Sequence, residues 1–284
     1  MKYKIFGAVF ILSAICLALV GAKLLSDREA RREQLANMKA PQVSWRAVEG
    51  WTISDMASDL EKRGLVTEKD FNTELKAVLA DYDFFGELKD LNPKPSSLEG
   101  YLFPDTYFIA SKPTASSVVK KMMDNLEGKM TTQMRVDIAK QDRSIYDVLT
   151  LASIIEKEVG RNTSKISSAD LQALQEERET VAGIFMNRLK INMALQSDAT
   201  IGYITKKNNP QASSADLLID SPYNTYKYRG LPPGPISNPS LSAIKAAIYY
   251  KDTDYLYFLT MKDGTAVYAK TLDEHNVNKR KYLK

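Results

Sequence analysis

The feature that most limits how this chain can fold is the apolar segment at its N-terminus, because residues 5–22 contain only apolar and small side chains. At about 1.5 Å of rise per residue, this run is just long enough for a helix that crosses a bilayer core of about 30 Å. Two lysines precede the run and a larger group of cations follows it, so the flanking charges do not settle its orientation.

Two alternatives to a membrane anchor are a cleaved signal peptide and lipoprotein processing at Cys16. The run is longer than a usual signal-peptide core, and no clean Ala-x-Ala site follows it. Bulky Ile15 stands before Cys16, where lipoprotein processing needs a small residue. We therefore expect an uncleaved, single-span transmembrane anchor over residues 1–25, followed by a polar stalk over residues 26–42.

Composition excludes several classes of site. The net charge of +4 is small and spread out, with no basic block, so we expect no nucleic-acid partner. Cys16 is the only cysteine and His275 the only histidine, which excludes an intrachain disulfide and a Cys- or His-rich metal site.

Residues 43–112 predict a small module with the order strand, helix, helix, strand. Residues 43–48 and 101–109 are the expected strands. Thr52 is a candidate N-cap with Asp55 three residues later, Gly64 ends the first helix, and Thr67 begins the second. The order resembles a LysM-like βααβ module, and that resemblance implies binding to glycans that contain N-acetylglucosamine. A packing module without a sugar site fits the pattern comparably well.

Residues 113–284 predict a larger mixed unit. We expect helices at 116–126, 145–159, 170–189 and 241–250, a long Pro- and Gly-rich loop at 221–240, and a hairpin of 255–259 with 266–268 around Asp263-Gly264. The predicted fold class is therefore α+β, with an N-terminal transmembrane helix, the LysM-like module and a larger catalytic domain.

Glu156 has an unusual position on the helix expected at 145–159. At about 100° per residue it projects between Ile145 and Leu149, inside the apolar arc, whereas Glu158 falls at the edge of that arc. Desolvation raises the pKa of a carboxyl, and a carboxyl that stays protonated near neutral pH is what a general acid needs. The alternative is that Glu156 pairs with a core-facing arginine, for example Arg188, or lies at a wet helix end.

The downstream loops favour a carbohydrate site. Residues 195–200 form a polar cluster after a helix, and residues 221–226 and 230–239 combine tyrosine, asparagine and proline. Proline reduces the entropy lost when a loop is ordered, while tyrosine and asparagine supply stacking surface and hydrogen bonds. A purely structural Pro-rich loop explains the same composition.

Seven motifs in fixed order extend these observations over nearly the whole chain: LEGYLFPDTY at 98–107, ASIIEKE at 152–158, NRL at 187–189, LQSD at 195–198, YNTY at 223–226, GLPPG at 230–234 and YLYF at 255–258. Together they closely resemble the YceG-like family, whose characterised members are endolytic peptidoglycan transglycosylases. The resemblance implies that the family's catalytic glutamate, the first Glu of the ASIIEKE motif, is Glu156. It further implies that substrate is bound by residues of the other motifs and by the second Glu, namely Glu99, Glu158, Gln196, Ser197, Asp198, Tyr223, Asn224, Thr225, Tyr226, Leu231 and Pro232.

The resemblance also implies the reaction and its setting. A single acid/base cleaves the MurNAc–GlcNAc β-1,4 bond without water, gives a 1,6-anhydro end, and needs no metal or cofactor. Such an enzyme terminates the elongation of glycan strands. The implied partners are peptidoglycan glycan strands, the cytoplasmic membrane, which the chain crosses once, and cell-wall synthases. The implied location is the inner membrane with the catalytic domain on the extracytoplasmic side.

Some positions depart from the family pattern. Val159 stands where threonine is frequent, and Ile191-Asn192 replaces a Gly-containing turn. Ala266 stands where a histidine is expected, which puts a supporting role for that histidine in doubt. His275 matches a C-terminal motif, and we interpret it as structural or as a residue that supports the site without contacting substrate.

Two further functions remain open. A lysozyme-like hydrolase would need a second carboxylate about 5–5.5 Å from the acid for retention or about 6.5–9.5 Å away for inversion, and Asp198 and Glu158 are the candidates. A membrane-anchored, non-catalytic peptidoglycan-binding scaffold would need no acid. A structure in which Glu156 is locked to an arginine, away from a cleft, would count heavily against Glu156 as the acid.

Overall fold

The computed structural model describes residues 41–81, 95–159, 167–207, 212–261 and 265–283, together with residues 21, 23, 25, 28 and 31. By compactness the chain divides after Trp45; residues 107–113 belong with the N-terminal part, and residues 46–106 and 114–284 form the second unit. The predicted anchor and stalk lie almost wholly outside the described residues. Within the described part of the chain, no helix is both long enough and apolar enough to span a membrane.

The first unit holds a two-stranded sheet. Strand β1 spans Gln42–Arg46 and strand β2 spans Thr106–Ala110. The Trp45 and Tyr107 rings stack at 6.0 Å between centroids, and the Ser111 N–H donates to the Pro41 carbonyl at 2.7 Å. The predicted second strand was too long, because its first five residues follow a turn at Gly100 and include Pro104, which cannot donate to a ladder.

Two helices follow β1 in the second unit. Helix α2 spans Ile53–Lys62 and helix α3 spans Glu68–Asp81. The predicted cap is confirmed as a full capping box, in which Thr52 accepts from the Asp55 N–H and Asp55 accepts from the Thr52 N–H at 2.9 Å. Gly64 adopts φ +66° directly after α2, which confirms it as the helix stop. The strand, helix, helix, strand order is therefore present.

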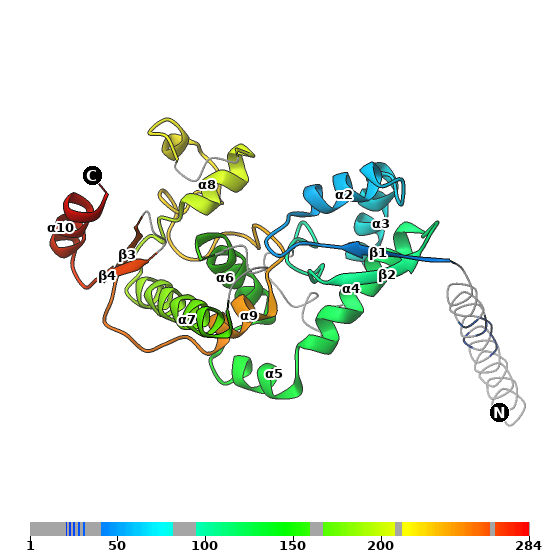
Figure 1. The fold of residues 1–284 in the computed structure, drawn as a ribbon, viewed down its shortest axis with the longest axis horizontal. Helices are drawn as coiled ribbons and strands as arrows, with labels where there is room; N and C mark the ends of the chain where they lie inside the picture. Colours follow the sequence, from blue (N-terminus) through cyan, green and yellow to red (C-terminus); the bar gives the residue numbers. More distant parts are fainter. Residues whose placement is uncertain are drawn as a thin grey trace, which may run out of the picture. The chain divides into compact units, whose positions relative to one another are not determined.

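The centre of the second unit is a cluster of helices (Figure 1). This cluster consists of α6 (Ile145–Glu158), α7 (Ser168–Lys190) and α9 (Leu241–Ile248), which pack against one another. Helix α5 (Thr132–Ala139) contacts α6 and α9, and helix α4 (Ala115–Lys129) packs against α3. Four of these five helices were predicted to within a few residues. Helix α6 is buried nearly all round, including Thr150 and Ser153 on its predicted polar side. A helix covered on every side has no solvent face that periodicity could identify.

The C-terminal part completes the unit. Helix α8 spans Asp198–Thr205, and a 3₁₀ turn spans Asp216–Leu218. Strands β3 (Tyr257–Thr260) and β4 (Ala266–Ala269) pair antiparallel as a hairpin. Helix α10 spans Leu272–Tyr282 and packs against that hairpin. The predicted hairpin is confirmed, although its turn at Asp263-Gly264 lies outside the described residues. Helices α5, α8 and α10 were not predicted; the Thr271–Glu274 capping box was a signal for α10. The predicted mixed α+β class is confirmed.

Candidate active site

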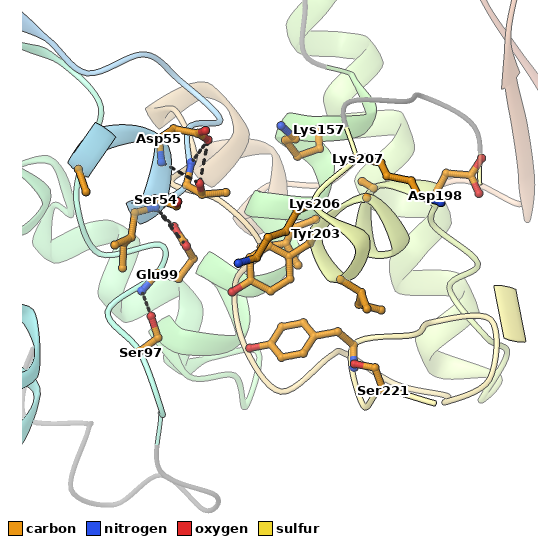
Figure 2. A pocket seen from close by; sticks show the side chains of 18 of the residues that line it. Ser54, Asp55, Ser97, Glu99, Lys157, Asp198, Tyr203, Lys206, Lys207 and Ser221 are labelled. Carbon is orange, nitrogen blue, oxygen red and sulfur yellow. Dashed lines mark hydrogen bonds between the residues drawn. The ribbon is translucent and has the colours of Figure 1, made fainter. Parts of the chain in front are cut away.

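A cavity of about 870 Å³ in the second unit brings together segments that are far apart in the sequence. Its wall combines the start of α2, two residues of α3, the end of α6, most of α8 and the two lysines after it. Ser97, Glu99, Ser221, Tyr223 and Ile236 complete the wall. Figure 2 shows Glu99 and Asp198 on opposite sides of this pocket, with the Tyr203 ring between them. A cavity of this size with a few convergent polar groups is a candidate ligand site.

Glu158 is the last residue of α6, and its partly exposed side chain lines the cavity. Burial of the carboxyl raises the pKa of Glu158, and the charge of Asp198 raises it further. The Ser197 hydroxyl, which donates a short hydrogen bond to Oε1 of Glu158, and the Arg188 guanidinium act in the opposite direction. Among the described residues Glu158 forms no ion pair within 4.0 Å. The raised pKa shifts the Glu158 carboxyl towards its protonated form, and this carboxyl lies in the wall of the pocket.

Glu156 has a different environment. Its side chain is 5% exposed and forms an ion pair with Arg178, whose Nη2 lies 2.9 Å from Oε1. Its other oxygen accepts from the Ser240 N–H at 3.0 Å and from the Ser240 hydroxyl, at the N-cap of α9. Arg178 also donates to Ser242 at 2.7 Å. Glu156 does not line the cavity, and the pairing that counts against it as the acid is present.

The arginine that pairs with Glu156 is Arg178, whereas the sequence suggested Arg188. Arg188 donates to the carbonyl oxygens of Leu195 and Leu256 and lies over the Tyr257 ring at 5.3 Å. It therefore fixes the chain immediately before Ser197. Arg178 lies ten residues earlier on α7, and only the packing of α6, α7 and α9 shows that it reaches Glu156.

The LQSD and YNTY motifs meet beside Glu158. The Ser197 N–H donates to the Thr225 hydroxyl at 3.0 Å, and the Gln196 N–H donates to the Thr225 carbonyl at 3.1 Å. The Tyr226 hydroxyl donates to Asp198 at 2.6 Å. These contacts hold Ser197 and Asp198 in place without any contribution from substrate.

Four of the twelve predicted site residues line the cavity: Glu99, Glu158, Asp198 and Tyr223. Four more, Gln196, Ser197, Thr225 and Tyr226, are not lining residues, but the contacts described above connect them to each other and to Glu158 and Asp198. Buried Asn224 donates to the Leu217 and Ile219 carbonyls at 3.0 and 2.8 Å, which is a structural role. Leu231 and Pro232 lie outside the cavity lining, as does Glu156.

Glu99 is buried in the opposite wall of the pocket. Its carboxyl accepts from the Ile53 N–H at the start of α2 and from the Asn238 side chain at 2.7 Å. Burial raises the pKa of Glu99 to about 8, against the lowering effect of the Ile53 hydrogen bond. Asn238 also accepts from the Gly100 and Leu102 N–H groups, so one side chain ties this wall to the loop before α9.

Sequence reasoning missed several lining residues. The start of α2, Lys157, Tyr203 on α8 and Lys206 directly after α8 all line the cavity. The capping box marked the start of α2 but not what that helix end faces. His275 stacks on Tyr257 at 5.2 Å between centroids and is not a lining residue. No group of three or more potential metal ligands occurs within the part of the chain that the structure describes.

Comparisons with known proteins extend these observations. The model of the YceG-like family matches residues 21–281. An endolytic murein transglycosylase of Bacillus subtilis is 41% identical over 186 residues, which are 66% of this chain and 48% of that protein. A second, from Streptococcus pneumoniae, is 37% identical over 187 residues, 64% of this chain and 31% of that protein. The chain thus spans about half or less of these relatives. A crystal structure of a YceG-like protein from Listeria monocytogenes has a TM-score of 0.67 and 33% identity, with 84% of this chain and 76% of that chain covered.

Proposed function

The chain belongs to the YceG-like family, and from this premise and the pocket geometry we propose that it is an endolytic peptidoglycan lytic transglycosylase. The substrate is the MurNAc–GlcNAc β-1,4 bond within a glycan strand, and the product carries a 1,6-anhydro-MurNAc end. The names of the Bacillus and Streptococcus relatives support this activity. Cleavage of nascent strands would make the protein a terminator of glycan elongation.

The observation that carries the proposal is the environment of Glu158. Its carboxyl is at the wall of the cavity, has a raised pKa, and has a hydroxyl partner in place of a cation. A general acid needs this combination, because it must hold a proton near neutral pH and still reach the substrate. We therefore assign the acid/base role to Glu158 in place of Glu156. Glu156 holds α6 to α7 and α9.

The reaction that follows uses one carboxyl in two steps. The Glu158 acid transfers its proton to the glycosidic oxygen as the bond from that oxygen to the MurNAc anomeric carbon breaks. The Glu158 carboxylate then removes the proton of the MurNAc 6-hydroxyl, whose oxygen attacks the same anomeric carbon. The proton returns to Glu158, and no water is consumed. The Ser197 hydroxyl stabilises the carboxylate between the two steps, since a hydrogen bond to the charged form favours that form.

A lysozyme-like muramidase is the second candidate, because Asp198 lines the same cavity as Glu158. A hydrolase would use Asp198 as a nucleophile or to activate water. The Tyr226 hydroxyl already occupies one Asp198 oxygen at 2.6 Å, which makes that carboxylate less available as a nucleophile. This contact favours the lytic reaction.

The setting of the enzyme is part of the proposal. We propose that residues 1–25 form a single-span anchor in the cytoplasmic membrane and that the catalytic part faces the extracytoplasmic side, where peptidoglycan lies. The apolar run at residues 5–22 supports this placement. Cell-wall synthases that produce nascent strands are the expected protein partners. Glycan binding by the LysM-like region stays a prediction.

Product analysis tests the function. The full chain, purified in mild detergent, is incubated with uncrosslinked peptidoglycan strands, and the new ends are identified by mass spectrometry. We expect 1,6-anhydro ends from the wild-type protein and none from Glu158→Gln. Free reducing ends would support the muramidase, and cleavage by Glu158→Gln at the wild-type rate would refute the assignment of the acid.

A further inference from the structure

Glu99 is a buried carboxyl in the pocket wall that the proposed mechanism does not use. Its side chain is 5% exposed and still lines the cavity. Oxygen Oε1 accepts the two shorter hydrogen bonds, from the Ile53 N–H at 3.0 Å and from Nδ2 of Asn238 at 2.7 Å. Oxygen Oε2 has only a second, longer share of the Ile53 N–H at 3.2 Å. Oε2 is therefore the oxygen available for a ligand.

All hydrogen-bond partners of the Glu99 carboxyl among the described residues are donors. If Glu99 is protonated, the proton belongs on Oε2, because Oε1 already accepts twice. The resulting O–H has no acceptor among those protein partners, and a buried donor without an acceptor is costly. An acceptor must come from the pocket, from water or from substrate.

Burial, more than the charges around it, shifts the Glu99 carboxyl towards its neutral form. Burial raises its pKa to about 8, and the Asp55 carboxylate on α2 adds to this, whereas the Ile53 and Asn238 hydrogen bonds and the Lys157 ammonium on α6 oppose it. Tyr203 on α8 and Tyr223 on the facing loop are the other titratable groups coupled to Glu99. Burial raises the pKa of both tyrosines, and the charge of Glu99 adds to it, so both hydroxyls stay neutral where Glu99 titrates.

We propose that Glu99 is a specificity-determining residue that binds the glycan as a neutral acid and donates its O–H to an oxygen acceptor of the sugar chain. The acetamido carbonyls of GlcNAc and MurNAc are the acceptors of the right chemistry, because an ionised carboxylate would repel a carbonyl oxygen. Asn238 and the start of α2 fix the carboxyl, so its proton has one direction. The inference rests on the proposed glycan substrate and names the form of Glu99 that recognises it.

A binding experiment tests this form without interference from the catalytic acid. The full chain carrying Glu158→Gln has no titrating group at that position. Binding of a GlcNAc–MurNAc tetrasaccharide is measured by calorimetry from pH 6 to 9.5. With Glu99 present, we expect the Kd to increase about tenfold for each pH unit above about 8. With Glu99→Gln added, we expect a Kd that does not change with pH, because the glutamine amide donates at every pH while its carbonyl oxygen still accepts from Ile53 and Asn238.

Asp55→Asn is a second variant that leaves Glu99 in place. It removes a negative charge that raises the Glu99 pKa, so the pKa of Glu99 should be lower in this variant. The fall in binding should therefore begin at lower pH than in the parent. A Kd that stays flat to pH 9.5 with Glu99 present, or the same slope in the Glu99→Gln variant, would overturn the inference. The outcome is separate from the proposed function, because that function fails if the wild-type protein leaves the strands uncut or produces free reducing ends, and neither result depends on how Kd varies with pH.

Discussion

Replacing Glu156 by glutamine removes the charge that neutralises Arg178 inside the helical core. Both side chains are 5% exposed, and Arg178 already has a buried Nε with no hydrogen-bond partner among the described residues. Removing one partner of a buried pair costs about 3–5 kcal/mol. The carbonyl of the new glutamine can still accept from Arg178 or from Ser240, so we expect a loss near the lower end of that range, about 3 kcal/mol. Because a domain is stable by about 5–15 kcal/mol, the variant should remain folded.

Replacing Glu158 by glutamine should not lower the free energy of unfolding, in contrast to Glu156→Gln. The pKa of Glu158 is raised in the folded protein, so the folded state retains a proton that the unfolded chain releases. That difference lowers stability as the pH increases through the carboxyl's unfolded pKa. A neutral glutamine removes this penalty, so stability at pH 7 should be unchanged or higher. Cleavage should nevertheless be lost, because the amide cannot transfer a proton to the glycosidic oxygen.

Urea unfolding of the full chain in detergent, followed by tryptophan fluorescence, measures the stability of each variant. Release of anhydro ends measures cleavage. Replacing both members of the pair, Glu156→Met with Arg178→Met, should be less destabilising than Glu156→Met alone, because no buried charge is left unpaired. The reasoning is refuted if Glu156→Gln keeps wild-type stability within about 0.5 kcal/mol and abolishes cleavage. That result would restore Glu156 as the acid.

Three further outcomes follow from the geometry. Gly183→Ala should destabilise the protein by about 2 kcal/mol or more, although alanine is normally the better helix former, because the new Cβ would lie 2.1 Å from the Lys251 carbonyl oxygen. Gly128→Ala, where nothing lies within 4 Å, should stabilise it by about 0.5–1 kcal/mol, and thermal unfolding compares the two. Ser197→Ala removes a hydrogen bond that lowers the pKa of Glu158, so the alkaline limb of kcat/KM should move to higher pH; an unchanged limb would contradict Glu158 as the acid.

Local signals in the sequence were sufficient for most helices of the second unit and for the hairpin. Capping residues and apolar spacing are properties of a few neighbouring residues. The cap at Thr52 identified the start of α2, and apolar spacing identified α6. The motifs also indicated segments that the fold brings together, since residues 195–198 and 223–226 meet beside the cavity. Strand β2 was misjudged because the bend at Gly100 comes from a positive φ, which apolar composition does not report.

We propose Glu158 in place of Glu156 as the acid, and periodicity alone could not make that choice. The projection at about 100° per residue assumed that α6 has one covered side. It ranked the two carboxyls by how far each lies inside the apolar arc. Helix α6 is instead surrounded, so depth in the arc measures burial and not access to a cavity. The deeper carboxyl, Glu156, forms an ion pair with Arg178. The carboxyl at the edge of the arc, Glu158 on the last residue of the helix, accepts from Ser197 and lines the cavity. An acid must be desolvated and reachable together, and a helix end beside a loop provides both, whereas the middle of a packed face provides only the first.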